Sequence, residues 1–455
     1  MSILSSNPAT GAPLKHYSPH SPDACERVLS ECQDTWKAWR GTSLDTRKQT
    51  LLSIAQKLRE KEHEYSRLMA EEMGKPITQG FQEIKKCAWV CNYYAQHGES
   101  LLKSIPVETG AAETIITFQP LGIILAIMPW NFPFWQVFRA AAPAIMAGNT
   151  MILKHAPNVP GCALAIEQIF KEIAPIPNLL RALLVDIPQT ESLIEDKRIQ
   201  GVTMTGSTKA GRQVAARTGQ LLKKTVMELG GSDPYIILKD ADLDLAAEAC
   251  ATGRMINNGQ SCIAAKRFVV VEEVREAFEQ KLKTHLARYT PGDPLLEKTN
   301  LGPLARIDLR DTLHDQVMRS IEQGARCLMG GTIPPGPGNF YPATLLTGVK
   351  SPMPAYTEEL FGPVAVIINA RDESHAIELA NDTTFGLGGA VFTRDTERGK
   401  RIATEQIEAG CCAVNTFVQS DPRLPFGGIK DSGFGCELGQ FGILEFSNIK
   451  PVIVK

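Results

Sequence analysis

Apolar runs of strand length alternate with segments of helical periodicity along much of this sequence. The first series of apolar runs lies at residues 122–128, 150–154, 179–185 and 201–205. Helical segments follow at 134–147 and 159–172, as a short helix before 201, and at 208–218. A strand followed by a helix and a further strand is typical of the βαβ unit. The pattern therefore predicts a parallel sheet with helices on both faces.

A second alternation of the same kind occupies the C-terminal half. Its apolar runs lie at 233–239, 267–273, 363–369, 389–395 and 411–415, and a Gly/Pro-rich loop is expected at 330–342. Two α/β units are therefore predicted, which agrees with the length of 455 residues, because a single core stops growing near about 250–300 residues.

The remaining segments lie outside this alternation. Residues 23–98 have the pattern of several amphipathic helices, with capping-type starts in "SPDACERV" and "SLDTRKQT". Residues 101–119 contain two β-prone runs around "ETGAAE", which predict a hairpin, and the terminal "SNIKPVIVK" predicts one last strand. Edges of this kind invite pairing with another chain, so we expect a homodimer or homotetramer.

Composition narrows the class of protein. The net charge of −2 gives no global attraction to nucleic acid or to anionic lipid. The eleven cysteines include no CxxC pair, and the N-terminus lacks the apolar core of a signal peptide, so we expect reduced thiols and a cytoplasmic protein. Prolines interrupt the apolar stretch 121–135, which excludes a membrane span there. The eight histidines are scattered, and no metal is inferred.

Three local motifs carry candidate chemistry. Cys262 in "NNGQSC" is either a small buried residue or a nucleophile. In "GVTMTGSTKAG", a strand is followed by Gly206 and Ser207 and then by a helix, which suits a pyrophosphate but also an ordinary turn and N-cap. No GxGxxG fingerprint is present; the nearest stretch, "GFGCELG" at 433–439, is interpreted as a turn.

The order of the motifs is more specific than any one of them. Glu228 precedes a glycine pair in "MELGG", and Cys262 follows 34 residues later (262 − 228). Further stretches lie at family spacing, namely "MPWNFPFW", "EELFGPVAV", "NDTTFGL" and "PFGGIKDSGFG". Over nearly its whole length the chain resembles the NAD(P)-dependent aldehyde dehydrogenase superfamily. It is most similar to a short bacterial branch of succinate-semialdehyde dehydrogenases.

The resemblance implies an α/β fold with two parallel domains. A Rossmann-like cofactor domain would comprise residues 1–100 and 120–228, and a catalytic domain residues 229–430. Residues 101–119 and 440–455 would form a β-hairpin oligomerisation element.

The resemblance also implies the catalytic roles. Cys262 would attack the aldehyde carbon, the side chain of Asn131 and the backbone N–H of Cys262 would stabilise the oxyanion, and Glu228 would activate water to hydrolyse the thioester. The alternatives are a turn residue between two prolines for Asn131 and a strand-end charge for Glu228.

NAD or NADP is the implied cofactor. The expected cofactor residues comprise a lysine for the adenosine ribose, a pyrophosphate loop and a nicotinamide group: Lys154, Gly206, Ser207, Gly211, Trp130, Glu359 and Phe361. Strict NAD enzymes of the family commonly have Glu three residues after the lysine. Pro157 occupies that position here, so no acidic side chain would oppose the 2′-phosphate of NADP.

The candidate substrate residues are Arg139 and Ser420. Arg139 lies on an otherwise apolar helix and matches an arginine that binds carboxylate in succinate-semialdehyde dehydrogenases; the alternative is a structural ion pair. Ile256 replaces a second arginine of those enzymes. The expected reaction is oxidation of succinate semialdehyde, with a broad-specificity aldehyde dehydrogenase as the alternative. A crystallin-like structural use of the fold is disfavoured, because Cys262 and Glu228 are both present.

Overall fold

In the first sheet, the strand that comes first in the sequence, β5, lies in the middle rather than at an edge. The computed structural model describes residues 2–455, and in its six-stranded sheet the order is β19-β9-β8-β5-β6-β7. All strands except β19 are parallel: β5 Ile123–Met128, β6 Thr150–His155, β7 Leu180–Ala182, β8 Ile199–Thr205 and β9 Lys224–Glu228. The chain moves outward from β5 to β7, then returns to the other side of β5 with β8. Ligands of such sheets bind at this reversal, outside the carboxyl ends of the strands.

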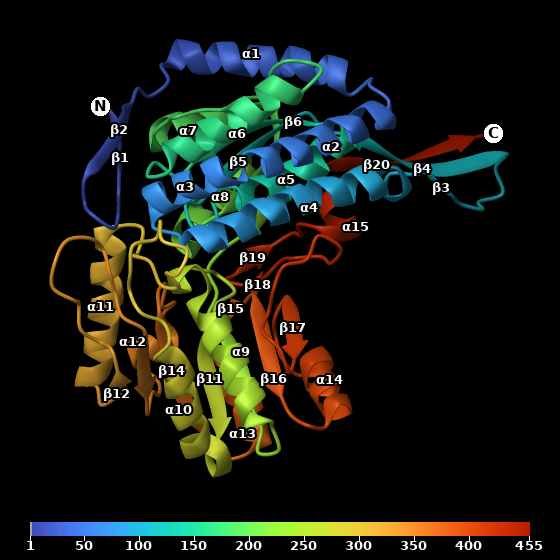
Figure 1. The fold of residues 1–455 in the computed structure, drawn as a ribbon. Helices are drawn as coiled ribbons and strands as arrows, with labels where there is room; N and C mark the ends of the chain where they lie inside the picture. Colours follow the sequence, from blue (N-terminus) through green and yellow to red (C-terminus); the bar gives the residue numbers. More distant parts are fainter. Residues whose placement is uncertain (1) are drawn as a thin grey trace.

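The second sheet has seven strands, in the order β12-β13-β14-β11-β10-β16-β17. They are β10 Asp233–Ile237, β11 Ala265–Val271, β12 Arg326–Met329, β13 Thr344–Thr347, β14 Val364–Ala370, β16 Gly388–Phe392 and β17 Cys411–Val414. All neighbours except β12 and β13 pair in parallel. The two α/β units predicted from the sequence are confirmed, one above the other in Figure 1.

Two short antiparallel strands depart from the sequence expectation. β12 pairs antiparallel with β13 at one edge of the second sheet. β19, Gly433–Phe434, comes after all strands of the second sheet but pairs antiparallel with β9 of the first. The interpretation of 433–439 as a simple turn was therefore wrong at its first two residues, because tertiary pairing with β9 makes them a strand.

Helices cover both sheets as the alternation predicts. The N-terminal helices are α1 Pro22–Trp39, α2 Leu44–Glu60, α3 Glu62–Met73 and α4 Ile77–Leu101. Ser21 and Ser43 cap α1 and α2, where the capping-type starts were expected. The first sheet carries α5 Trp135–Ala147, α6 Pro160–Ile173, α7 Ile187–Glu195 and α8 Thr208–Gln220. The second unit contains α9 Leu243–Met255, α10 Glu272–Leu286, α11 Ile307–Glu322, α12 Pro354–Thr357, α13 Glu373–Asn381 and α14 Thr396–Glu405.

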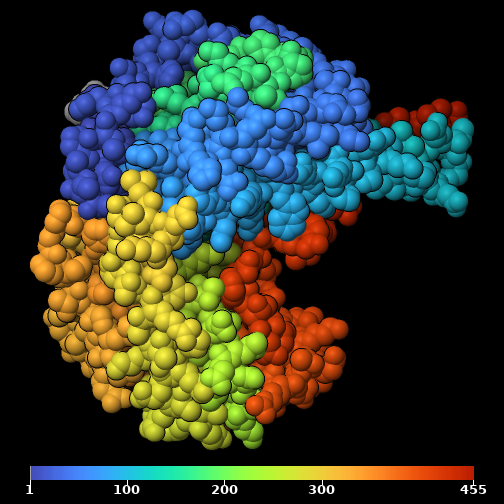
Figure 2. All heavy atoms as spheres, viewed as in Figure 1, coloured from blue at the N-terminus to red at the C-terminus, as the bar shows by residue number. Residues whose placement is uncertain are grey.

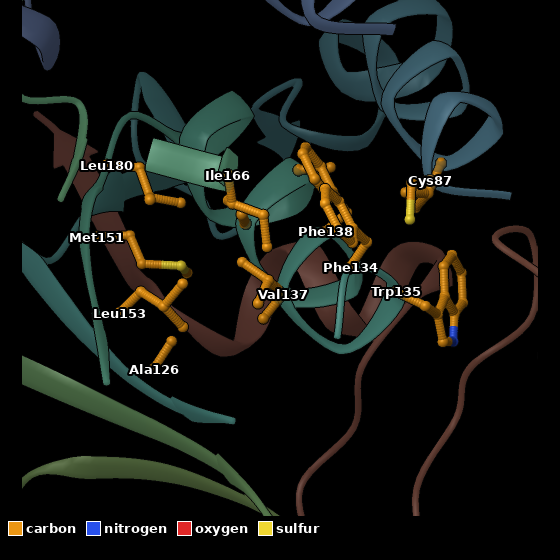
Figure 3. Packing of buried hydrophobic residues seen from close by; sticks show 14 of the residues in the cluster. Cys87, Ala126, Phe134, Trp135, Val137, Phe138, Met151, Leu153, Ile166 and Leu180 are labelled. Carbon is orange, nitrogen blue, oxygen red and sulfur yellow. The ribbon is translucent and has the colours of Figure 1, made fainter. Parts of the chain in front are cut away.

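Helix α5 lies inside the molecule, and every one of its residues is buried. Figure 3 shows Val137 pointing toward Leu153 and Met151 of β6, while Trp135 points away from them, on the side of Cys87 from α4. The apolar face of α5 therefore holds the helix against the sheet, and the opposite face is left for the residues of the site.

A three-stranded sheet forms an arm that projects from the rest of the molecule (Figures 1 and 2). It pairs β20 Ser447–Val454 with β4 Glu113–Pro120, and β4 with β3 Ile105–Pro106, all antiparallel. The predicted hairpin and last strand are thus both present, and they pair with each other. α15, Gly439–Glu445, precedes β20.

Two small sheets complete the fold. They pair β1 Ile3–Ser6 with β2 Pro13–Tyr17, and β15 Phe385–Gly386 with β18 Ile429–Lys430. Among the described residues, no helix combines the length and the apolar character that crossing a membrane requires.

Candidate active site

The loop that carries Cys262 is held by a left-handed backbone segment before it and by hydrogen bonds of that segment. The one-turn 3-10 helix η1, Ile256–Gly259, holds Asn257, Asn258 and Gly259 at φ of 54°, 58° and 74°, a region that asparagine and glycine tolerate best. The side chain of Asn258 donates to the carbonyl oxygens of Gly74 and Pro303 at 2.9 and 3.0 Å. These contacts tie the loop to both halves of the chain, so Cys262 is presented on a rigid support.

Cys262 is partly buried and its thiol is a weak acid in this environment. Burial raises the pKa of the thiol to about 12, although the positive charges of Arg139 and Lys266 act in the opposite direction. A thiol of this kind is protonated at neutral pH, so a nucleophilic attack requires that a base accept its proton.

Asn131 lies beside the nucleophile loop, in the turn between β5 and α5. Its Nδ2 donates to the carbonyl oxygen of Gln260 at 3.1 Å, and Asn131 as a whole is 4% exposed. Among residues 2–455, no acceptor is found for the backbone N–H of Cys262. A side-chain amide and a free backbone N–H next to one thiol are the two donors that an oxyanion formed on that thiol requires.

Glu228 ends strand β9 and is 1% exposed. Neither carboxyl oxygen has a hydrogen-bond partner among the described residues. Burial raises the pKa of Glu228 well above its usual value, Arg139 opposes the rise, and Glu437 adds to it. A buried carboxyl group without partners is expensive in a folded protein, which is typical of a group retained for proton transfer.

Two cavities meet at Cys262. The first cavity has a volume of about 190 Å³ and the second about 240 Å³, and Cys262 lines both. The polar residues of the first cavity include Glu83, Lys86, Arg139, Gln419 and Ser420. Its apolar wall consists of Phe132, Trp135, Ile256, Ile263, Val418 and Phe426. A molecule in each cavity would therefore reach the same sulfur from different sides.

The second cavity lies at the carboxyl ends of β5, β8 and β9, where the first sheet reverses its strand order. Trp130, Gly206, Ser207, Glu359 and Phe361 line it, five of the seven predicted cofactor residues. The rings of Trp130 and Phe361 pack edge to face with their centroids 5.7 Å apart. A carboxylate is fixed there as well, because Glu359 accepts the backbone N–H of Gly231 at 3.0 Å.

This second cavity fits a dinucleotide on grounds of its own structure. Ser207 caps α8 by accepting the N–H of Ala210 at 3.3 Å, so the N-terminus of the helix opens on the cavity next to Gly206. Free N–H groups at a helix N-terminus bind phosphate. A Cβ built on Gly230 would lie 2.6 Å from the Glu359 carboxylate, so a larger residue there would displace that carboxylate.

Two predicted cofactor residues lie outside the lining of this cavity. Lys154 is at the end of β6, and burial lowers the pKa of its ammonium group. Gly211 was expected to contact the pyrophosphate, but its N–H is engaged within α8, where it donates to the Ser207 carbonyl at 2.9 Å. A Cβ at this position would clash with Leu229. Gly211 thus allows α8 to pack closely on the end of β9.

The two predicted substrate residues both line the first cavity. Arg139 is 1% exposed and forms an ion pair through Nε with the carboxylate of Glu437, while its Nη2 donates to Thr205 Oγ1 at 3.2 Å. This is the structural ion pair that was the alternative reading of Arg139. Ser420 Oγ accepts a hydrogen bond of 2.8 Å from Lys86 Nζ.

Three residues of the site were missed by sequence reasoning. Lys266 Nζ donates to the carbonyl oxygens of Ser261 and Cys262 at 2.9 and 2.7 Å and lies 3.5 Å from Glu359 Oε1. Its signal was a charged residue at the start of the apolar run of β11. Glu437 lay in the stretch interpreted as a turn, and Lys86 lies on α4 directly after the exposed Lys85, so the helical pattern does not single it out.

Comparisons with known proteins identify the class. The sequence matches the aldehyde dehydrogenase family over residues 2–452. The chain belongs to this family, and its fold, with a cysteine that lines both the first and the second cavity, agrees with it.

Individual relatives are similar over nearly the whole chain. The succinate semialdehyde dehydrogenase [NAD(P)+] Sad of Escherichia coli (strain K12) is 46% identical, covering 99% of this chain and 97% of its own. A probable succinate-semialdehyde dehydrogenase [NADP(+)] of Synechocystis is 47% identical, covering 99% of each chain. The structure of succinic semialdehyde dehydrogenase from Streptococcus pyogenes with NADP+ superimposes with a TM-score of 0.97 at 35% identity, covering 99% of each chain.

Proposed function

We propose that this protein oxidises succinate semialdehyde to succinate with NAD(P)+ and water. The observation that carries the proposal is the composition of the first cavity. The cations Arg139 and Lys86 and the hydroxyl of Ser420 line it together with the thiol of Cys262. A small aldehyde with a distal carboxylate matches both ends of that cavity. The similar proteins of Escherichia coli and Synechocystis carry this activity in their names.

Cys262 acts as the nucleophile. Its thiol gives up its proton to a water molecule and the sulfur bonds to the aldehyde carbon, which places negative charge on the aldehyde oxygen. The Nδ2 of Asn131 turns from the carbonyl oxygen of Gln260 to this oxygen, and the N–H of Cys262 is already free for it. A neutral amide stabilises the oxyanion without drawing charge from the thiolate beforehand.

Glu228 acts on the acyl group that then remains on sulfur. The bound nicotinamide cofactor supplies an acceptor for the hydride of the aldehyde carbon. Glu228 takes a proton from water, whose oxygen bonds to the acyl carbon, and the carbon–sulfur bond breaks to release the acid. Since Glu228 does not line either cavity, its side chain turns toward Cys262 for this step.

The cofactor would be held by Trp130, Gly206, Ser207, Glu359 and Phe361 around the second cavity, and Lys154 would bind its adenosine ribose. Gly211 supports this group through packing. Both NAD and NADP are accepted, because Pro157, three residues after Lys154, is exposed and carries no charge. The Escherichia coli relative is named for NAD(P)+ and the Synechocystis relative for NADP(+).

A broader aldehyde dehydrogenase activity is the second candidate. The apolar wall of the first cavity favours it, since Phe132, Trp135 and Phe426 suit an aliphatic or aromatic aldehyde. Ile256 adds to the apolar surface at the position where a second arginine was missing. We further propose that the protein acts in the cytoplasm, where its eleven free thiols would stay reduced.

A comparison of two substrates of equal length tests the proposal. Initial rates of NADH and NADPH formation are measured for succinate semialdehyde and for butyraldehyde with the purified protein. We expect kcat/KM to be higher for the acid by at least about 30-fold, the size of a partly desolvated charge pair. Equal values for the two aldehydes would favour the broad activity instead.

A further inference from the structure

Lys86 lies where the first cavity opens to the outside. It belongs to α4 and lines the first cavity together with Cys262. It also lines an open groove of about 750 Å³ outside that cavity, with Trp89 and Asp421 among the other residues of the groove. A molecule that moves from solvent through the groove toward Cys262 therefore passes the ammonium group of Lys86.

Three other buried cations around the site have a carboxylate partner, while the guanidinium groups of Arg254 and Arg267 donate to backbone carbonyl oxygens. These ion pairs are Lys75 with Glu83, Arg139 with Glu437 and Lys266 with Glu359. For Lys86, no carboxylate oxygen among residues 2–455 lies within ion-pair distance. Its Nζ contacts the hydroxyl of Ser420 at 2.8 Å and lies 4.5 Å from the ring centroid of Trp135.

The nearest acidic groups are already engaged. The carboxylate of Asp421 accepts hydrogen bonds from Arg423 Nε at 2.9 Å and Nη2 at 2.6 Å. Glu83 accepts the backbone N–H groups of Phe134 and Trp135, both at 2.9 Å, besides its ion pair with Lys75. A partly buried ammonium without a counter-charge is costly, and an incoming carboxylate removes that cost.

We infer that Lys86, together with the hydroxyl of Ser420, binds the carboxylate of the substrate, and that Arg139 is a structural cation held by Glu437. This inference rests on the proposed function, because it assigns the ligand of the carboxylate in that substrate. It also explains how the site dispenses with the arginine that Ile256 replaces.

The chemistry of the pair suits a carboxylate. The ammonium of Lys86 donates to one carboxylate oxygen while Ser420, which accepts from Lys86, keeps its own hydroxyl proton for the other. The indole of Trp135 supports the ammonium from one side, so the cation is positioned before the substrate arrives. The charge of Arg139 is already balanced by a carboxylate, because its Nε faces Glu437, and its Nη2 also donates to Thr205.

The test is the ratio of kcat/KM for succinate semialdehyde to kcat/KM for butyraldehyde. Lys86→Met should lower this ratio by at least about 30-fold, and Lys86→Arg should keep it within about threefold of the wild type. Lys85→Met is the matched control, since Lys85 is its neighbour on α4, has a side chain 65% exposed and pairs with Glu62, and it lines the outer groove but not the first cavity. That control removes the same charge and should leave the ratio within about twofold.

Arg139→Met separates the two cations. Loss of its ion pair leaves the buried Glu437 unpaired, so both substrates should lose kcat/KM together and the ratio should stay within about threefold. A selective loss for the acid in Arg139→Met, with an unchanged ratio in Lys86→Met, would overturn the inference and leave the proposed function intact. A wild-type ratio near one would instead refute the proposed function.

The pH dependence of the wild-type ratio supplies a test that needs no variant. Burial, and then the charge of Arg139, lowers the pKa of Lys86 to about 8, while Asp421, Glu83 and Cys87 act in the opposite direction. Below that pH Lys86 is charged and binds carboxylate; above it the charge and the preference are lost. The ratio should therefore fall between pH 7 and 9.5 in the wild type but stay level in Lys86→Arg. Ionisation of Cys262 cancels in the ratio, so a level wild-type profile would contradict the inference.

Discussion

Cys262 and Glu228 both lie in surroundings that disfavour their charged forms, and this shapes what substitutions do. Burial raises the pKa of both groups, which favours the protonated form of each. One of them has to lose its proton before each half of the reaction. Arg139 lowers the pKa of both, which makes the Arg139–Glu437 ion pair part of the electrostatics of catalysis as well as of the fold.

Substitution of the two groups should separate the two halves of the reaction. Cys262→Ala should abolish aldehyde oxidation while the binding of NADPH, followed by fluorescence, persists. Glu228→Gln is nearly isosteric and should slow release of the acyl group, so rapid mixing should show a burst of about one NADPH per subunit before a slow steady state. Near wild-type turnover in Cys262→Ala would mean that another residue is the nucleophile.

The reactivity of the Cys262 thiol should rise with pH beyond the range of an ordinary cysteine. A thiol with a pKa of about 12 is protonated at neutral pH, and its thiolate fraction grows about tenfold per pH unit. Alkylation by iodoacetamide in the absence of cofactor should therefore accelerate about 100-fold from pH 8 to 10, measured on the peptide that contains Cys262. A plateau below pH 8 would show a thiolate stabilised at neutral pH.

The sequence reveals a site residue only when the features that identify it lie close to it along the chain. Cys262 and Glu228 were predictable because each belongs to a local motif at family spacing. The partner of Arg139 is Glu437, on a segment almost 300 residues away, so only the folded chain shows that the guanidinium is already paired. Lys85 and Lys86 are adjacent in one helical pattern, and the sequence does not tell which of them faces the cavity.

Among the elements, long strands and helices were predictable and short ones were not. Most parallel strands of both sheets coincide with the predicted apolar runs, because strands buried on both faces consist of continuous apolar sequence, but β9 and β13 were not among those runs. β19 has only two residues, and its pairing with β9 depends on a tertiary contact that no local pattern encodes. The second cavity, by contrast, follows from the strand order, since a reversal point beside β5 creates the crevice.

The turn between β6 and α6 should control the choice of cofactor. Pro157 is exposed there, three residues after Lys154. Pro157→Glu should lower kcat/KM for NADP relative to NAD by about tenfold, because a carboxylate near a 2′-phosphate costs about 1–2 kcal/mol through solvent.

Pro157→Gln is the matched control, since it removes the proline with the same side-chain length and no charge. The ratio for this variant should stay within about twofold of the wild type. Equal losses of NAD and NADP activity in Pro157→Glu would place position 157 away from the adenosine ribose.

For the molecule as a whole, the projecting arm is the feature that a single chain does not explain. The arm of β3, β4 and β20 projects from the rest of the molecule in Figure 2, and β20 is an edge strand of its sheet. Ile449 and Ile453 on β20 are 52% and 67% exposed, and Ile105 on β3 is 47% exposed. A small sheet with apolar side chains in water needs a further surface to cover it.

We therefore predict at least a homodimer in which a second copy covers the arm. Sedimentation velocity should give at least twice the mass of one chain, independent of concentration in the micromolar range. Replacing both Ile449 and Ile453 with Lys should dissociate the assembly, because each buried isoleucine would become a buried charge. Leu222→Lys is the control, since Leu222 is 93% exposed after α8 and outside the arm, and its assembly should be unchanged. A wild-type protein that sediments as a monomer at all concentrations would leave the arm without a partner copy and contradict the prediction.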